Sequence, residues 1–388
     1  MTTRIATRYE PRDSLHAQQE FRATTMSNHT WPSYRTFLVK SIVRESDTAK
    51  SFYLVPADGG GLTPYHPGQH LPLRLAIPDH PRPVIRCYTL SDCFRESYYR
   101  LTVKRESAPQ HLPDAPAGVS SNYLHDHVRV GDAIEAKMPS GSFYLDMEQY
   151  HSVAMIAGGI GVTPMISMLN AIARTRVPRN IYFFFTLRHG GDHVFKEHLQ
   201  ELQKTCPNIH LKVFYGEPRP HDRQGLDFDH AGRIDAEVLR QVLPSLQMEY
   251  YVCGPSGMMQ AISGGLRRAG VTAESIRTES FGPSSLWNRN ASRIDEAPTE
   301  GSTESLEVKF LRSGVTAQWT SADGTLLELA ESYGVNIDFG CRYGDCATCL
   351  TPLVRGRVAY LHPTGAEPEP GSCLPCSCRP ETAVDLDA

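Results

Sequence analysis

The spacing of hydrophobic residues changes twice along the chain. Between residues 34 and 148, short apolar or alternating segments such as "TFLVKSIV" and "QHLPLRLAI" are separated by Pro, Gly and Asp. This spacing is typical of an antiparallel barrel or sandwich. From residue 152 onwards, continuous apolar runs alternate with amphipathic stretches of helical length, as in "SVAMIAGG" followed by "PMISMLNAIART". That alternation predicts a parallel, doubly wound α/β domain.

A third pattern follows a polar stretch. After residue 304 come the strand-like "LEVKFL" and the amphipathic "TLLELAESYG", with Gly334 as the expected helix stop. The Ser/Glu/Asn-rich stretch before it reads as a linker, and the polar start lacks the apolar core of a secretory signal. We therefore expect a polar tail (1–33), a β-barrel (34–150), an α/β domain (151–283), a linker (284–304) and a C-terminal domain (305–388).

Composition limits the classes of function. The 388 residues are 40% hydrophobic and 21% charged, with a formal charge of −4. This is an ordinary globular composition, and it lacks the basic excess of a nucleic-acid binder. No apolar run approaches the ~20 residues that span a bilayer. We expect a cytoplasmic protein without a membrane span or a nucleic-acid partner, and the sequence leaves its oligomeric state open.

Six of the ten cysteines fall between Cys341 and Cys378, which indicates one local site. In a cytosolic protein such clustering favours metal over disulfides. The stretch "DFGCRYGDCATC" has the spacing C-x4-C-x2-C, with glycines that let a chain wrap a small [2Fe–2S] cluster. The alternative is zinc, held by two C-x2-C pairs that begin at Cys346 and Cys373. Zinc would leave Cys341 without a role.

The segment 305–388 resembles a plant-type ferredoxin domain, which implies a β-grasp fold and an iron–sulfur cluster. The resemblance assigns three ligands to Cys341, Cys346 and Cys349. The fourth comes from a group of three: Cys373, Cys376 and Cys378. Cys376 is favoured because the family's last ligand lies four residues before a Pro or small residue and a short apolar strand. Cys378 is the expected substitute, since residues two apart on a strand share a face.

Two stretches of the barrel region hold residue types that suit a cofactor with phosphates and a ring system. In "RCYTLSD", Arg86 suits a phosphate, Tyr88 suits packing on a ring system, and Thr89 suits a hydrogen bond near a reactive ring nitrogen. In "GVSSNYLHD", Gly118 and Ser121 stand at a helix start that suits a pyrophosphate.

These stretches resemble the ferredoxin–NADP reductase superfamily, and the second resembles the reductase part of flavohaemoglobins. Ser120 replaces the more usual Val, and the stretch favours FAD over FMN. The resemblance also brings "ESFGP" to the flavin, although Phe281 is equally suited to domain packing. The implied flavin-binding residues are Arg86, Tyr88, Thr89, Ser91, Gly118, Ser121, Glu279 and Phe281.

Two further motifs indicate a pyridine nucleotide. "AGGIGVTPM" joins a buried strand to a helix, so a pyrophosphate can approach its glycines and the helix N-terminus. This motif and the later "VCGPSGMM" resemble the superfamily's nucleotide-binding segments. The implied residues are Gly158, Gly159, Gly161, Thr163, Pro164, Cys253, Gly254 and Pro255. Thr89 and Cys253 are the expected catalytic residues. Arg188 and His189 make no convincing 2′-phosphate site, which favours NADH over NADPH.

The order of domains implies an electron-transfer reductase. A nicotinamide donates two electrons as a hydride, a flavin splits the pair, and an iron–sulfur cluster carries one electron at a time. We expect electrons to pass from NADH through FAD and the cluster to a partner oxygenase, of the Rieske type or another monooxygenase. The alternatives are a redox-sensing iron–sulfur flavoprotein and a reductase of a non-oxygenase redox protein. With only residues 1–33 before the barrel, a self-contained flavohaemoglobin is not expected.

Overall fold

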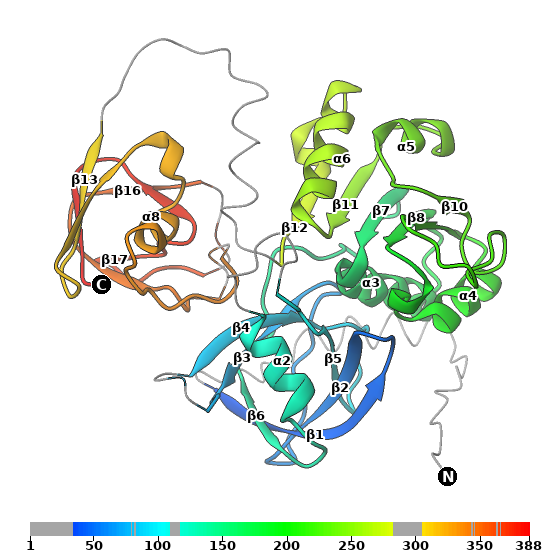
Figure 1. The fold of residues 1–388 in the computed structure, drawn as a ribbon, viewed down its shortest axis with the longest axis horizontal. Helices are drawn as coiled ribbons and strands as arrows, with labels where there is room; N and C mark the ends of the chain where they lie inside the picture. Colours follow the sequence, from blue (N-terminus) through cyan, green and yellow to red (C-terminus); the bar gives the residue numbers. More distant parts are fainter. Residues whose placement is uncertain are drawn as a thin grey trace.

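The computed structural model describes residues 34–78, 80, 83–108, 117–281, 305–342, 344, 346–361, 364 and 366–388. The predicted polar tail and the predicted linker lie outside these residues. Three lobes are visible in Figure 1, and each corresponds to one of the hydrophobic patterns of the sequence. No helix in the described part is both long enough and apolar enough to cross a bilayer.

The first lobe is a six-stranded antiparallel sheet with the order β4-β3-β6-β1-β2-β5. An isolated bridge between Leu90, just after β4, and Leu101 of β5 brings the two edges of the sheet together at that point. One helix, α2 (Val119–Asp126), lies beside it. The strands are β1 (Arg35–Arg44), β2 (Ala49–Pro56), β3 (His70–Leu75), β4 (Val84–Thr89), β5 (Tyr99–Lys104) and β6 (Ala133–Ala136).

Alternation along these strands builds the core of the barrel. In β1, Phe37 and Val39 are buried while their neighbours Leu38 and Lys40 are exposed, as expected for a strand with one face in the core. Phe52, Leu54 and other buried side chains of the neighbouring strands pack into the same cluster.

The second lobe is a parallel six-stranded sheet with the order β10-β9-β8-β7-β11-β12. All six residues of β7 are buried, which explains its continuous apolar sequence, because helices cover both faces of such a sheet. Its strands are β7 (Val153–Gly158), β8 (Ile181–Leu187), β9 (Ile209–Tyr215), β10 (His230–Ala231), β11 (Glu249–Cys253) and β12 (Ile276–Glu279). Its α-helices are α3 (Val162–Thr175), α4 (Lys196–Thr205), α5 (Ala236–Val242) and α6 (Ser256–Arg268).

The third lobe is a mixed sheet with the order β14-β13-β19-β15-β17, packed against α8 (Leu326–Ser332). Thr325 and Glu328 form a capping box at the start of α8, and Gly334 takes a positive φ of 72° after its end. The strands are β13 (Leu306–Phe310), β14 (Val315–Trp319), β15 (Thr351–Arg355), β16 (Val358–Tyr360), β17 (Ser372–Cys373), β18 (Cys378–Pro380) and β19 (Val384–Leu386). The predicted class, an antiparallel barrel followed by a doubly wound α/β domain and a β-grasp domain, is confirmed.

Candidate active site

β4 carries the first predicted motif at an edge of the barrel sheet. It pairs with β3 in antiparallel register, so Thr89 lies opposite His70 and Tyr88 opposite Leu71. Thr89 is buried, and its hydroxyl has no hydrogen-bond partner within the described residues. A buried hydroxyl without a partner fits a ligand that supplies the missing hydrogen bond. The backbone of an edge strand is likewise available to a ring system.

Tyr88 and Ser120 connect β4 to α2. The Tyr88 hydroxyl lies 2.8 Å from Ser120 Oγ, and burial raises the pKa of Tyr88 to about 12. Ser120 is the position where the flavin motif usually has Val, so the departure has a structural role: it gives the tyrosine hydroxyl a partner. At the start of α2, Ser121 Oγ donates to the Gly118 carbonyl at 3.2 Å. A Cβ at Gly118 would come within 2.6 Å of that hydroxyl oxygen and 2.8 Å of Glu106 Cβ, so a side chain there would crowd the turn.

Ser91 lies away from the open edge of β4. Its hydroxyl is 2.7 Å from Thr102 Oγ1 and donates to the Arg100 carbonyl at 3.2 Å, so protein groups already satisfy it. The Arg86 guanidinium donates to the carbonyl of Ile85 and lies 4.8 Å from the ring centroid of Phe339 in the third lobe. Arg86 therefore contacts the third lobe.

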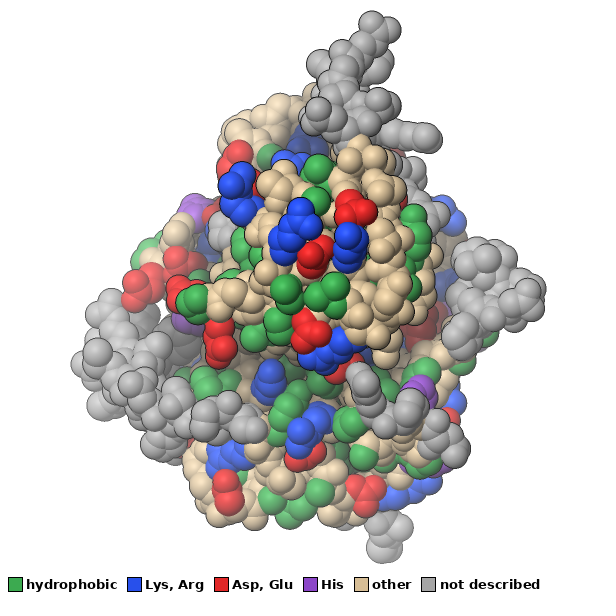
Figure 2. All heavy atoms as spheres, turned by 90° about the vertical axis from the view of Figure 1, so that its left-hand side faces the viewer, with side chains coloured by type: hydrophobic (Ala, Val, Ile, Leu, Met, Phe, Trp, Pro, Cys, Tyr) green, Lys and Arg blue, Asp and Glu red, His purple; other side chains and the backbone are tan. Residues whose placement is uncertain are grey.

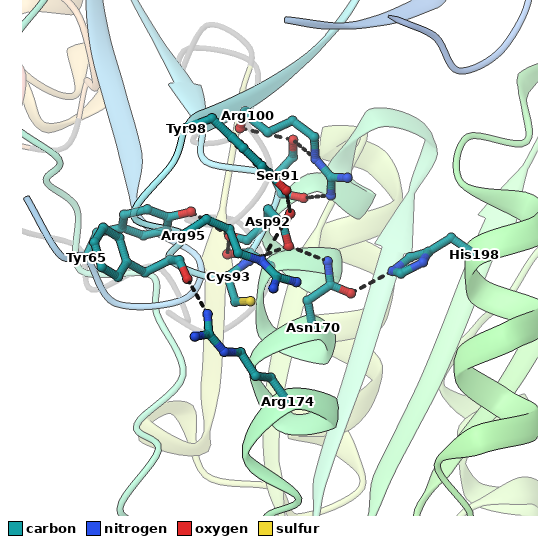
Figure 3. A network of polar contacts seen from close by, with 12 residues as sticks. Tyr65, Ser91, Asp92, Cys93, Arg95, Tyr98, Arg100, Asn170, Arg174 and His198 are labelled. Carbon is teal, nitrogen blue, oxygen red and sulfur yellow. Dashed lines mark hydrogen bonds and ion pairs between the residues drawn. The ribbon is translucent and has the colours of Figure 1, made fainter. Parts of the chain in front are cut away.

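A buried polar network joins the barrel to the α/β lobe, with Asp92 at its centre (Figure 3). Asp92 Oδ1 accepts from Asn170 Nδ2 on α3 at 2.7 Å, and Oδ2 accepts from the Tyr98 hydroxyl at 2.9 Å. Burial alone would raise the pKa of Asp92, but the charges of Arg100 and Arg95 outweigh burial and lower it. The carboxylate is thus held ionised between the lobes, and it fixes α3 relative to β4.

The two glycine motifs of the α/β lobe meet where β7 and β11 end side by side. A Cβ at Gly161 would lie 2.3 Å from the Cys253 carbonyl oxygen, and one at Gly254 would lie 2.8 Å from Gly158 Cα. Gly159 has a positive φ of 53° and open space around it. Side chains at these positions would separate the two loops, so the glycines leave a backbone cradle that fits a pyrophosphate.

Thr163 and Pro164 occupy the first turn of α3, at the same end of the sheet as the glycine cradle. Thr163 Oγ1 donates to the Ile160 carbonyl at 3.0 Å. Pro255 also belongs to this group, because a Cβ at Gly158 would lie 2.6 Å from its ring.

Cys253 and Glu279 stand at matched positions on the neighbouring strands β11 and β12. Cys253 is fully buried, and burial together with the Glu279 charge raises the pKa of its thiol. Across the lobe boundary, Glu279 Oε1 lies 3.7 Å from Nδ1 of the buried His70 of β3. Phe281 is 46% exposed at the end of the described stretch. Glu279 therefore brings the end of β12 next to β3, the strand that pairs with β4.

The cysteine loop brings the four favoured thiols together in two pairs. The backbone N–H groups of Cys341 and Cys346 each donate to the other's sulfur, at 3.2 and 3.4 Å, and the Cys349 and Cys376 sulfurs are 3.2 Å apart. Gly344 N–H donates to Cys376 Sγ at 3.3 Å. No three His, Cys, Asp or Glu side chains of the described chain form a site for one metal ion. A [2Fe–2S] cluster takes two thiolates on each iron, and two pairs of thiols fit that donor set.

Cys378 does not share the environment of Cys376, contrary to the expectation from strand alternation. Residues 375–377 form a turn, closed by a hydrogen bond from Ser377 N–H to the Leu374 carbonyl, so the rule for extended chains does not apply. The Cys378 thiol contacts Cys373 instead, and this hydrogen bond and burial raise its pKa.

Comparisons with known proteins agree with this architecture. Three family profiles match: "Oxidoreductase FAD-binding domain" over residues 39–144, "Oxidoreductase NAD-binding domain" over 155–264, and "2Fe-2S iron-sulfur cluster binding domain" over 309–381. A solved flavohaem-like FAD/NAD-binding domain of a nitric oxide dioxygenase from Vibrio cholerae is 30% identical, with a TM-score of 0.57. The match covers 65% of this chain and all of that one. The chain belongs to this family of flavohaemoprotein-type FAD- and NAD-binding reductases. It is an NAD(P)H-dependent oxidoreductase with FAD, nicotinamide-nucleotide and [2Fe–2S] domains.

Other relatives match this reductase over different lengths. A flavohemoprotein of Bacillus cereus is 38% identical over 253 residues, which are 65% of this chain and 62% of that protein. The chain thus spans a little over three fifths of the flavohemoproteins that it matches. A solved phthalate dioxygenase reductase is 23% identical, with 92% of this chain and 98% of that one covered and a TM-score of 0.54. This likeness extends the shared fold through the third lobe.

Proposed function

We propose that this reductase takes a hydride from NADH onto FAD and delivers single electrons through a [2Fe–2S] cluster to a partner oxygenase, of the Rieske type or another monooxygenase. The observation that carries the proposal is the position of the cysteine loop. The Lys137 ammonium of the barrel donates to the Cys346 carbonyl of that loop at 3.4 Å, and Arg86 packs on Phe339. The predicted flavin strand and the predicted cluster are therefore neighbours, as electron transfer between them requires.

In this proposal the barrel residues bind and orient the flavin. Thr89 supplies a buried hydroxyl to the reactive edge of the ring, Tyr88 packs beside the ring, and Gly118 and Ser121 receive the pyrophosphate at α2. Arg86 is proposed to bind a flavin phosphate, and it also contacts Phe339 of the third lobe. FAD, when bound, accepts a hydride and releases its electrons one at a time. Glu279 and Phe281 border the same edge from the α/β lobe.

The α/β lobe positions the nicotinamide. The glycine cradle and the N-terminus of α3 favour the negative charge of a pyrophosphate. Cys253, at the end of the central strand β11, then stands beside the nicotinamide. Its raised pKa keeps the thiol neutral, so it excludes water without placing a charge near the hydride path.

Charge pairing beyond the ends of β8 and β9 supports NADH as the coenzyme. Arg188 Nε lies 3.9 Å from Glu217 Oε2, and Arg219 Nη1 lies 3.5 Å from Asp47 Oδ2. The second terminal nitrogen of Arg219, Nη2, lies 3.0 Å from His189 Nε2. A 2′-phosphate would have to displace carboxylates from both arginines, whereas a ribose hydroxyl accepts a carboxylate as its partner.

The acceptor is proposed to be a protein with a basic face. Residues 305–388 hold eleven acidic and six basic residues, a formal charge of −5. Both signs are interspersed on the face shown in Figure 2, where the third lobe faces the viewer. Five of the six basic residues pair with carboxylates of the same lobe: Lys309 with Glu307, Arg312 with Asp387, Arg342 with Glu331, Arg355 with Asp385, and Arg357 with Glu381. The exposed Asp338, Glu367 and Glu369 have no ion pair within the described residues and supply three of the excess negative charges.

One experiment tests the whole sequence of transfers. Absorption spectra of the purified protein are recorded before and after NADH under anaerobic conditions, with extraction of flavin and analysis of iron and zinc. We expect FAD, two irons per chain and bleaching of both chromophores by NADH. Zinc in place of iron, or a flavin that stays oxidised with NADH and NADPH, would reject the proposal. Steady reduction of an artificial acceptor distinguishes a reductase from a redox sensor, which has no need of rapid turnover.

A further inference from the structure

Contacts between the barrel and the third lobe concentrate on one short segment, and the following inference rests on the proposed function. Two guanidinium groups contact the ring of Phe339: Arg86 of the barrel at 4.8 Å and Arg342 of its own lobe at 3.8 Å from the ring centroid. Lys137, on the barrel side, reaches the Cys346 carbonyl. Cation–π contacts of this kind hold two surfaces in a defined orientation. The cysteine loop is therefore held at β4 by residues that bind no cluster.

Between these contacts lies Cys87, the middle residue of the R-x-Y motif. A Cβ at Gly340 would be 2.9 Å from Cys346 Sγ and 3.5 Å from Cys87 Sγ, so both sulfurs lie over the same glycine. The Cys87 and Cys346 sulfurs are therefore neighbours at Gly340, one from β4 and one from the cysteine loop. Gly340 thus leaves the space in which a thiol of the flavin strand meets a predicted cluster ligand.

Cys87 also faces the flavin side of the molecule. It lies two residues before Thr89 on β4, and residues two apart on a strand point to the same face. From the α/β lobe, Glu279, which pairs with Cys253, lies 3.7 Å from His70, the β3 residue opposite Thr89. The thiol therefore stands between the predicted flavin and nicotinamide site and the predicted cluster.

We propose that Cys87 is a positioning residue for electron transfer, whose thiol donates an S–H···S hydrogen bond to the Cys346 sulfur and fixes the cluster against β4. Cys87 keeps its proton and changes no oxidation state. Each transfer moves one electron from the reduced flavin to the oxidised cluster, and the second follows after the acceptor has taken the first. A donor to a ligand sulfur stabilises the reduced cluster, which carries one more negative charge, and so raises its reduction potential.

The test compares three variants of the full chain with its cofactors: Cys87→Ala, Cys87→Ser and the control Cys93→Ala. Cys93 is a buried thiol of the same barrel, beside Asp92 and Arg174. The cluster potential is measured by a dithionite titration followed by electron paramagnetic resonance, and the rate of cluster reduction by stopped-flow. We expect Cys87→Ala to shift the potential to a more negative value and to slow cluster reduction about tenfold. The Ser variant keeps a hydrogen-bond donor, so its potential and rate should remain nearer those of the parent. The control Cys93→Ala should have the potential and the rate of the parent.

A second variant keeps the test decisive if Cys87→Ala fails to assemble. Gly340→Ala inserts a methyl group between the two sulfurs and should shift the potential in the same direction. Unchanged potential and rate in both variants, or equal shifts in the Ala and Ser variants of Cys87, would overturn the hydrogen bond. The dithionite titration needs no nicotinamide, so it stays informative even if NADH fails to reduce the flavin and the proposed function fails.

Discussion

At the scale of single residues, the choice among three cysteines decides where the cluster is held. Cys376 contacts Cys341 and Cys349, whereas Cys378 contacts Cys373. We expect Cys376→Ser to leave NADH-dependent flavin reduction intact and to lower electron transfer to a protein acceptor by about 100-fold, because an altered ligand weakens or displaces the cluster. Flavin bleaching measures reduction by NADH, iron content measures retention of the cluster, and cytochrome c reduction measures electron transfer to a protein acceptor.

Cys378→Ser is the matched control for that substitution, because it replaces an equally buried thiol two residues away. It should retain iron and electron transfer. Loss of iron in Cys378→Ser with retention in Cys376→Ser would reverse the ligand assignment. Loss of flavin reduction in Cys376→Ser would show that the cysteine loop supports the flavin lobe itself.

Coenzyme preference is likewise a property of few residues. Glu217 pairs with Arg188, and both side chains are largely exposed. Glu217→Lys removes a charge that repels a 2′-phosphate and adds one that attracts it. We expect the ratio of kcat/KM for NADPH to that for NADH to rise about tenfold, equivalent to about 1.4 kcal/mol. Glu274→Lys, an exposed change elsewhere in the lobe, is the control. An equal rise in both variants would mean that net charge, and not this position, selects the coenzyme.

The sequence predicted motifs better than the contacts between them. The R-x-Y motif, the two glycine motifs and the C-x4-C-x2-C loop were all visible, because each is a local pattern. The contact of Cys87 with Cys346 was not, since it joins residues 259 positions apart in the numbering. Ser91 matched the motif, yet its hydroxyl is used by Thr102 and Arg100, and only the closed barrel brings these groups together.

At the scale of elements, periodicity located most strands and helices of the first two lobes, and boundaries moved by a few residues. The predicted helix 164–175 is α3, which begins earlier, at Val162. β12 (Ile276–Glu279) was not predicted, because it is too short to show a periodic pattern. It forms a strand through its parallel pairing with β11. The short strands β16, β17 and β18 were missed for the same reason, since two or three residues carry no measurable period.

One buried histidine makes the stability of the α/β sheet sensitive to acid. His193 packs between Phe185 and Tyr215, and burial lowers its pKa to about 3. The unfolded chain takes up this proton below about pH 6.5, whereas the folded chain does not do so until about pH 3. Stability is therefore full above pH 6.5 and falls as the pH drops, by about 1.4 kcal/mol per pH unit from this group.

His193→Asn removes that proton uptake and keeps an amide near the Tyr215 hydroxyl, which lies 2.7 Å from His193 Nδ1. We expect a lower stability at pH 7, because the smaller side chain leaves a cavity, but a shallower loss of stability between pH 6.5 and 4. Urea unfolding at several pH values measures the slope. The exposed His221→Asn is the control. A slope identical to that of the parent would show that other groups account for the acid sensitivity.

At the scale of the whole molecule, the net charge of the third lobe is expected to govern its encounter with an acceptor. Most of its basic residues are paired within the lobe, so Glu367 and Glu369 contribute charge that nothing nearby neutralises. Exposed charges act over about 8–10 Å at moderate salt, and they accelerate association when the partner has the opposite sign.

The double substitution Glu367→Gln and Glu369→Gln should therefore slow reduction of cytochrome c, a basic haem protein, several-fold at low ionic strength. At high salt the variant and the parent should converge. Glu274→Gln removes an exposed carboxylate from the α/β lobe and should have no effect. Rates that are independent of salt in the parent, or equally reduced by the control, would mean that docking depends on contacts other than these charges.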